Sequence, residues 1–300
     1  MAYMTLNKER FYLDDSKMTK IYDLSLPWGM DTPLWPFPGP RQDLQFPRGQ
    51  YLERFHKRTM TYTGTLHAGT HMDAPNHVLH LEEVDRQANG YTLAEIHLER
   101  CIGTGVIVDM RYLRDEFEEK WKKADGNPEK MGHIWHEIRP EEVEAACEKD
   151  GLEIRENDWV IINTGFHHYW RINNDKYFNY YPGQGPTLAN WLIDEKHIKG
   201  ISGTWGATDA PLWHHPLSAQ MPWLDEAYRK ATGSDPAIDY PDYEPCHRLY
   251  MQNGVCTVEN AGGDIDEITG RRMIIAAFPF RCEAADGGFV RLVAWEEGSF

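Results

Sequence analysis

The chain has 300 residues, of which 41% are hydrophobic, and its 11 Trp, 15 Tyr and 11 Phe are enough for a large core. Its net charge of −16 and its lack of a basic run argue against nucleic acid or an anionic membrane as a partner. The five cysteines form no CxxC pair, and no stretch approaches 18 apolar residues, so we expect neither a disulfide framework nor a membrane span. The N-terminus resembles no secretory signal, and we therefore expect a soluble, cytoplasmic protein.

Short runs of β-branched and aromatic residues alternate with helical patterns along the chain. Pro140 and Pro186 each begin a helical pattern, and the first of these ends at Gly151. The alternation indicates an α/β fold, and the absence of a repeat or a Gly/Ser linker favours a single domain over residues 1–300. Strands are predicted at residues 21–26, 105–110, 159–165, 198–203, 255–260, 272–280 and 288–297.

Two segments look like insertions into this domain. In residues 112–137, Leu113, Phe117 and Trp121 recur at helical spacing among many charges, which predicts an amphipathic excursion on the surface. Residues 211–245 contain six prolines together with several Trp and Tyr residues, too many aromatic side chains for a disordered linker. This second segment is expected to form a lid over a pocket, a subunit contact or a plain surface excursion.

The segment "TLHAGTHMDAPNH", residues 65–77, holds three histidines and one aspartate around a glycine and a proline. Its proline is incompatible with one continuous helix. On a straight strand His67 and His71 would lie about 13 Å apart at roughly 3.3 Å per residue, too far for one metal ion. The side chains converge only if the backbone bends, and Gly69 is where it can take unusual conformations or lie close to a ligand. We therefore predict a strand over residues 61–66 that runs into a metal-binding turn.

The chemistry of this turn indicates a catalytic metal. Two imidazoles and one carboxylate, from His67, His71 and Asp73, suit Zn²⁺, Mn²⁺ or Fe²⁺ and leave coordination positions open for water and substrate. His77 lies four residues beyond Asp73, so its imidazole is a candidate for proton transfer or for a third histidine ligand. A chain with 14 histidines also forms some clusters by chance, which is the alternative to a metal site.

These residues also carry a family resemblance. "HAGTHMDAPNH" fills every fixed position of the His-x-Gly-Thr-His-x-Asp-x-Pro-x-His motif and resembles the cyclase-like metal-dependent hydrolases, which include bacterial kynurenine formamidase, isatin hydrolase and trans-dienelactone hydrolase. The resemblance implies that the first two histidines and the aspartate bind one metal ion and that His77 transfers protons. It also implies that His247 and Glu259, twelve residues apart in "HRLYMQNGVCTVEN", hold a second metal that shares Asp73.

The resemblance extends over most of the chain after residue 20. "YPGQGPTLANWLIDEKHIKGISG" (181–203) and "EAADGGFVRLVAW" (283–295) are similar to other parts of the family pattern. The chain departs from it after Gly203, where "TWGATDAP" stands in place of an early aspartate. The family implies a swivelling β/β/α cyclase-like domain, with a mixed sheet or partial barrel and flanking helices. It also implies one or two Zn²⁺ or Mn²⁺ ions per chain and a homo-oligomer, a dimer or a tetramer.

The expected reaction is hydrolysis of a cyclic amide, a lactone or an arylformamide by metal-bound hydroxide, with His77 as the acid/base group. A non-haem iron oxygenase is the rival enzyme class, because "HMD" with a distant histidine also fits a two-His-one-carboxylate site. A third alternative is a binding protein in which the metal only stabilises the fold. Aromatic side chains near the expected site favour an aromatic or cyclic small-molecule substrate, unless they are ordinary core residues. The candidates for substrate contact are Phe166, Trp205, Trp213 and His214, with His167 and His168 also near a strand end.

Overall fold

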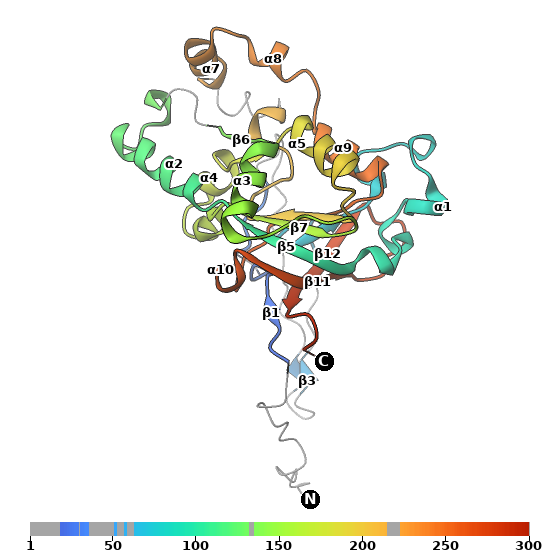
Figure 1. Cartoon of the computed structure of the whole chain (residues 1–300). Helices are drawn as coiled ribbons and strands as arrows, with labels where there is room; N and C mark the ends of the chain where they lie inside the picture. The colour runs from blue at the N-terminus through green and yellow to red at the C-terminus, as the bar shows by residue number, and fades with distance from the viewer. Residues whose placement is uncertain are drawn as a thin grey trace, which may run out of the picture.

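Eight strands form the main sheet, which closes on itself into a barrel (Figure 1). The computed structural model describes residues 19–29, 31–35, 51–52, 57–58, 63–131, 135–214 and 223–299. The strand order is β1-β12-β11-β5-β7-β9-β10-β4, and β4 also pairs with β12, so the barrel has seven strands with β1 added outside. The strands are β1 (Tyr22–Asp23), β4 (His71–Asp73), β5 (Ile102–Asp109), β7 (Trp159–Asn163), β9 (Gly200–Gly203), β10 (Cys256–Glu259), β11 (Arg271–Pro279) and β12 (Gly287–Trp295).

The barrel is mixed, because its strands run parallel on one side and antiparallel on the other. β5, β7, β9 and β10 are parallel, whereas β11, β12 and β4 pair antiparallel with their neighbours. Alternate side chains of β7 therefore face two different cores. Trp159 and Ile161 pack in the cluster that gathers residues from all around the barrel, while Val160 and Ile162 pack against the helices. This explains why the sequence of β7 is almost continuously apolar.

Helices cover the parallel side of the barrel. Figure 1 shows α3, α4, α5 and α9 gathered on one side of the sheet, with α7 and α8 farther out. The first of these, α3, begins at Pro140 and ends before Gly151, whose φ of 67° gives the left-handed cap that the sequence predicts. The helices are α1 (Arg86–Asn89), α2 (Tyr112–Lys123), α3 (Pro140–Asp150), α4 (Asn174–Asn179), α5 (Pro186–Asn190), α7 (Leu224–Thr232), α8 (Pro236–Asp239), α9 (Pro245–Gln252) and α10 (Ile265–Ile268).

Shorter elements connect these helices and strands. The helix that begins at Pro186 continues as the π-helical turn η10 (Trp191–Glu195). Short two-stranded pairs are β2 (Tyr51–Leu52) with β3 (Lys57–Arg58) and β6 (Glu137–Ile138) with β8 (Gly183–Gln184). The 3-10 turns are η4 (Pro75–His77), η5 (Leu81–Glu83), η6 (Leu93–Glu95), η7 (Leu98–Arg100), η8 (Pro128–Lys130), η9 (Phe166–Tyr169) and η11 (Pro211–Trp213).

The predicted α/β fold with a mixed sheet or partial barrel and flanking helices is confirmed, and the barrel is closed rather than partial. The strand predicted at 61–66 is wrong in its position. Residues 61–62 lie outside the described residues, and residues 63–66 form an isolated bridge and bends. The strand forms instead at β4, because there the backbone finds hydrogen-bonding partners on both sides, in β10 and in β12.

The two predicted insertions differ in how they meet the core. α2 is amphipathic as expected, and its Leu113 and Phe117 are buried in the core between the sheet and the helices. In the second segment, residues 215–222 lie outside the described residues, and α7 and α8 follow them. Among the described residues, no helix combines the length and apolar character that crossing a membrane requires.

Candidate metal centre

The kinked segment, residues 67–77, bends where the sequence predicts. Gly69 has a φ of 61°, in the left-handed region, and a Cβ at this position would lie 2.8 Å from Cδ1 of Trp28. Both facts favour glycine, since an L side chain would strain the backbone and collide with the indole ring. The bend turns the side chain of His67 back toward Asp73, which follows on β4. The prediction of a bend at Gly69 is therefore confirmed.

The first ligand group consists of His67, His71 and Asp73. Oδ1 of Asp73 lies 2.8 Å from Nδ1 of His67 and 3.4 Å from Nε2 of His71. Nδ1 of His71 lies 2.8 Å from the carbonyl oxygen of Gly69, so it donates its proton there and leaves Nε2 free to bind a cation. His71 and Asp73 are both buried. The local sequence thus presents three ligand atoms to one point.

The second ligand group consists of Asp73, His247 and Glu259. Nε2 of His247 lies 3.0 Å from Oε1 of Glu259 and 3.7 Å from Oδ2 of Asp73. The antiparallel register of β4 and β10 pairs His71 with Glu259, so these side chains lie side by side although 188 residues separate them. His247 comes from the first turn of α9. All three members are buried.

Asp209 holds the second group in place from behind. Its Oδ2 lies 2.6 Å from Nδ1 of His247 and also accepts a hydrogen bond from the backbone N–H of that residue. Its Oδ1 accepts another hydrogen bond from the N–H of Cys246. A carboxylate behind a histidine fixes the ring and makes its other nitrogen a better metal ligand. Nε2 of His247 consequently faces the cluster.

The electrostatics of the cluster fit a divalent cation. Burial would raise the pKa of Asp73, but His71 and His67 outweigh it and hold that pKa well below its usual range. Burial would lower the pKa of His67, but Asp286 and Asp73 outweigh it and raise the pKa to about 10. In the part of the chain that the structure describes, buried Oδ2 of Asp73 has no hydrogen-bond partner, which is costly unless a cation or proton satisfies it. In the metal-free protein the proton on His67 occupies part of the place that a metal ion would take.

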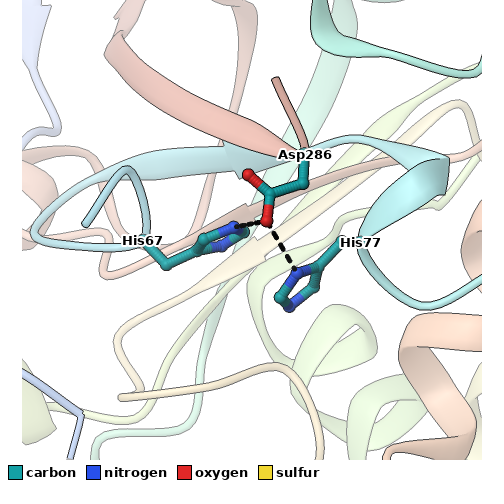
Figure 2. Close-up of side chains that lie close together, drawn as sticks. All are labelled: His67, His77 and Asp286. Carbon is teal, nitrogen blue, oxygen red and sulfur yellow. Dashed lines mark ion pairs between the residues drawn. The ribbon is translucent and has the colours of Figure 1, made fainter. Parts of the chain in front are cut away.

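His77 stands at the edge of this cluster, on the 3-10 turn η4. Its ring stacks on that of His67, with centroids 4.0 Å apart, and its side chain is 24% exposed, so solvent reaches it. Figure 2 shows one carboxylate oxygen of Asp286 facing both rings. This oxygen, Oδ2, lies 3.3 Å from Nε2 of His67 and 3.8 Å from Nδ1 of His77. His67, His77 and Asp286 form a further set whose ligand atoms lie close enough for a metal. Both sequence alternatives for His77, proton transfer and metal ligation, therefore remain compatible with its position.

A pocket opens over the cluster, and its aromatic wall is not the one predicted. Trp35 and Phe178 line it, with ring centroids 5.6 Å apart in an edge-to-face arrangement. Gly206 lets the ring of Phe178 lie against the backbone, because a Cβ there would be 2.6 Å from Cδ1 of that ring. The other lining residues include His67, His71, His77, Glu244, His247 and Glu259.

The predicted substrate contacts lie elsewhere. Phe166 and Trp205 are fully buried in the core between the sheet and the helices. Trp213 is also buried, and its indole N–H donates a hydrogen bond to Glu137. Their predicted contact with a substrate is not supported by this placement. His214, expected on an exposed loop or in the pocket, is buried behind the pocket residue Glu244, 3.2 Å from it.

His167 and His168 are not among the residues that line the pocket. They face Asp266, with Nε2 of His168 2.8 Å from its Oδ2. This is another set of residue types that could hold a metal. However, the Arg111 guanidinium lies 3.6 Å from Oδ1 of Asp266, and its charge opposes a cation there. We therefore assign these histidines no part in the candidate centre.

Three acidic residues of the site were missed by the sequence analysis: Asp209, Glu244 and Asp286. A signal existed for two of them. Asp209 lies in "TWGATDAP", which departs from the family pattern, and Asp286 lies in "EAADGGFVRLVAW". Glu244 had no such signal, because its place in the pocket depends on how the chain enters α9.

Fold and site together define a class: a closed α/β barrel with a set of ligands suited to a divalent metal, two of them on strand β4. The profile of the Cyclase family, described as "Putative cyclase", matches residues 22–210. The chain therefore belongs to the Cyclase family. A comparison with curated protein sequences finds no match.

Solved structures share this fold. Isatin hydrolase A from Labrenzia aggregata, bound to benzyl benzoate, is similar with a TM-score of 0.67 and 21% identity over 95% of this chain and 96% of that one. Isatin hydrolase A from Ralstonia solanacearum has a TM-score of 0.68 and 19% identity, over 93% and 92% of the two chains. A predicted metal-dependent hydrolase from Bacillus stearothermophilus has a TM-score of 0.58 and 17% identity, over 93% and 100%.

Proposed function

We propose that this chain is a metal-dependent hydrolase that opens a cyclic amide, a lactone or an arylformamide, with His77 as the acid/base group. One observation carries the proposal. The two oxygens of Asp73 face two different ligand groups, and buried Oδ2 has no hydrogen-bond partner among the described residues. This geometry suits a carboxylate that bridges two cations. The ions that fit the ligand types are Zn²⁺ and Mn²⁺.

The residues divide the work of such a reaction. His67, His71, Asp73, His247 and Glu259 would hold the metal ions. When bound, divalent cations lower the pKa of water to about 7 and polarise a carbonyl group. In His77, Nδ1 faces Asp286 at 3.8 Å, so Nε2 is the nitrogen that would move a proton to or from the substrate.

The pocket favours a flat substrate. Trp35 and Phe178 offer apolar ring faces and edges beside the metal ligands, which suits an aromatic or cyclic compound. The structural relatives named isatin hydrolase act on one such compound, and we include isatin among the proposed substrates for that reason. A small molecule is thus the proposed partner, and assembly into a homo-oligomer stays a prediction.

The oxygenase alternative has less support. A two-His-one-carboxylate iron site would use only three of the ligand residues, whereas His67 and Glu259 both lie within the cluster. Oxygen uptake by the Fe²⁺-loaded protein measures this alternative directly. Uptake that depends on an organic substrate, without hydrolysis, would favour the oxygenase.

The proposal is tested with metal-free, Zn²⁺-loaded and Mn²⁺-loaded protein and a panel of isatin, formanilide and a small aromatic lactone. We expect ring opening or deformylation only in the loaded protein. Product formation is followed by chromatography and metal content by mass spectrometry. If no carbonyl compound of the panel is turned over with either metal, the proposal is wrong.

The role of His77 is tested separately. His77→Asn should lower kcat about 10²- to 10⁴-fold, the usual contribution of a general acid or base, while metal content stays unchanged. The matched control is His97→Asn, since His97 is an exposed histidine outside the pocket. Loss of metal from His77→Asn would instead identify His77 as a ligand.

A further inference from the structure

The pocket contains a carboxylate that neither ligand group uses. Glu244 lines the pocket together with His77 and His247, yet its side chain is only 12% exposed. Among the described residues, it belongs to none of the sets that could hold a metal. Burying an ionised group costs free energy unless it has partners. The Glu244 carboxylate therefore needs hydrogen-bonding or charged partners, and the free protein supplies only some of them.

The backbone at Glu244 is strained. Its φ of 50° and ψ of 52° place it in the left-handed region, which costs a residue with a Cβ about 1–2 kcal/mol. Two backbone hydrogen bonds hold this conformation: its N–H donates to the carbonyl of Trp213, and its own carbonyl accepts from the N–H of Arg248. Strain that the surroundings enforce is typical of functional positions. Here it fixes a carboxylate at the pocket wall, three residues before His247.

His214 keeps this carboxylate ionised. Its Nδ1 lies 3.2 Å from Oε1 of Glu244, and its own ring is buried against Trp35. Burial would raise the pKa of Glu244, but His214 and the charge of His247 outweigh it and lower the pKa to about 2. The Tyr243 phenol lies beside the same carboxylate. Because an ionised carboxylate offers about four acceptor sites, capacity remains for a hydrogen-bond donor from a ligand.

We propose that Glu244 is a specificity-determining residue that accepts a hydrogen bond from an N–H group of the substrate. The proposal rests on the proposed hydrolase function and narrows it. Substrates with an N–H beside the scissile carbonyl, such as secondary amides and formamides, satisfy the buried carboxylate. N-alkylated amides offer no N–H and leave the carboxylate without this hydrogen bond. Lactones place a ring oxygen against it, so that two hydrogen-bond acceptors face each other. A site built for a donor rejects analogues that lack the donor.

The test compares isatin with N-methylisatin on the Zn²⁺-loaded protein. Hydrolysis gives kcat/KM, and calorimetric titration at low temperature gives Kd independently of turnover. We expect wild type to favour isatin about 10- to 100-fold, the usual effect of one hydrogen bond to a charged acceptor. Glu244→Gln, which keeps shape and loses charge, should reduce the preference about tenfold. Glu244→Met, which removes the acceptor, should abolish it and exclude a purely steric effect of the methyl group.

The matched control is Glu83→Gln. Glu83 lies on the turn η5 and pairs with Arg248 of α9, but it is not among the residues that line the pocket. This variant should keep the wild-type preference. Equal values for the two compounds in wild type, no binding of either, or an unchanged preference in Glu244→Met would overturn the proposal. Loss of metal from both Glu244 variants would also overturn it, because Glu244 would then be a ligand. Discrimination in Kd without any hydrolysis would instead contradict the hydrolase function and leave the Glu244 contact standing.

Discussion

The two ligand groups of the centre are built in different ways. The first comes from one kinked segment, where a single bend at Gly69 brings His67 back to Asp73. The second needs the barrel, because β10 and α9 deliver Glu259 and His247 from distant parts of the chain. The comparison shows that a local bend is enough to assemble the first ligand group. The second group depends on the register between strands and on where α9 begins. The predictions below address the groups jointly and then separately.

Asp73→Asn should have the largest effect, since Asp73 serves both groups. We expect metal content to fall for both ions and kcat/KM to fall about 1,000-fold or more, because metal polarisation contributes several kcal/mol to such reactions. Metal analysis and kinetics measure this. Asp266→Asn is the matched control, a carboxylate that also faces two histidines but lies outside the centre. A variant that retains both metals and its activity would contradict the bridging role.

The first group should make the metal-free protein sensitive to alkaline pH. Asp286 and Asp73 raise the pKa of His67 from 6.5 to about 10 against the opposing effect of burial. The proton on His67 therefore stabilises the metal-free fold fully below pH 6.5, and this contribution is lost as the pH rises toward 10. We expect the free energy of unfolding to fall by up to a few kcal/mol across this window. Denaturant titrations at several pH values measure it.

Metal-loaded protein is the comparison for this pH effect. A bound cation replaces the proton on His67, so the loss between pH 6.5 and 10 should be absent. Metal uptake near pH 7 should release protons, which calorimetry detects in buffers of different ionisation enthalpy. Uptake without proton release would mean that His67 binds no proton in the metal-free state.

Asp209→Asn should separate the two groups. Among the described residues, the Asp209 carboxylate bonds to His247 of the second group and to neither histidine of the first. Removing such a supporting carboxylate weakens a metal site about 10- to 100-fold. We expect the affinity for one metal ion per chain to fall by this factor while the other is retained. Equal weakening of both sites, measured by competition with a chelator, would show that the groups are not independent.

Gly69→Ala should affect only the first group, and more mildly. The added Cβ meets both a positive φ and Cδ1 of Trp28 at 2.8 Å. Gly151→Ala is the matched control, with a φ of 67° and no atom of the described residues within 4 Å of the new Cβ. Both variants should be destabilised by about 1 kcal/mol from the backbone alone, and Gly69→Ala by about 1–3 kcal/mol more from the contact. Thermal unfolding compares them, and equal losses would mean that the indole ring moves aside freely.

The sequence predicted much of the fold for physical reasons that are local. Strands such as β7 and helices such as α3 carry their own signals, in buried β-branched runs or in Pro140 and Gly151 at the helix ends. The strand at 61–66 was misplaced because β4 depends on partners in β10 and β12. Pairing across a closed barrel has no counterpart in local sequence.

The residues of the site also divide into those with a local sequence signal and those placed by long-range contacts. His67, His71 and Asp73 were predictable because residue spacing and Gly69 leave few other arrangements. His247 and Glu259 were reached only through a family resemblance, since no local pattern joins them. The aromatic contacts were predicted at Phe166, Trp205 and Trp213, yet Trp35 and Phe178 line the pocket. Packing between distant segments decides which rings face it. Glu244 was missed for the same reason.

The shortest strand of the barrel also has a mechanical consequence. β4 has only three residues, yet it pairs with both β10 and β12 and so closes the barrel. Two of those three residues, His71 and Asp73, are proposed ligands. A cation held there would stabilise the pairing of β4 with β10 and β12 and so keep the barrel closed. Amide hydrogen exchange of β4 and its two partners should then slow together on loading, and the barrel should begin to open at this line when the ion is withdrawn.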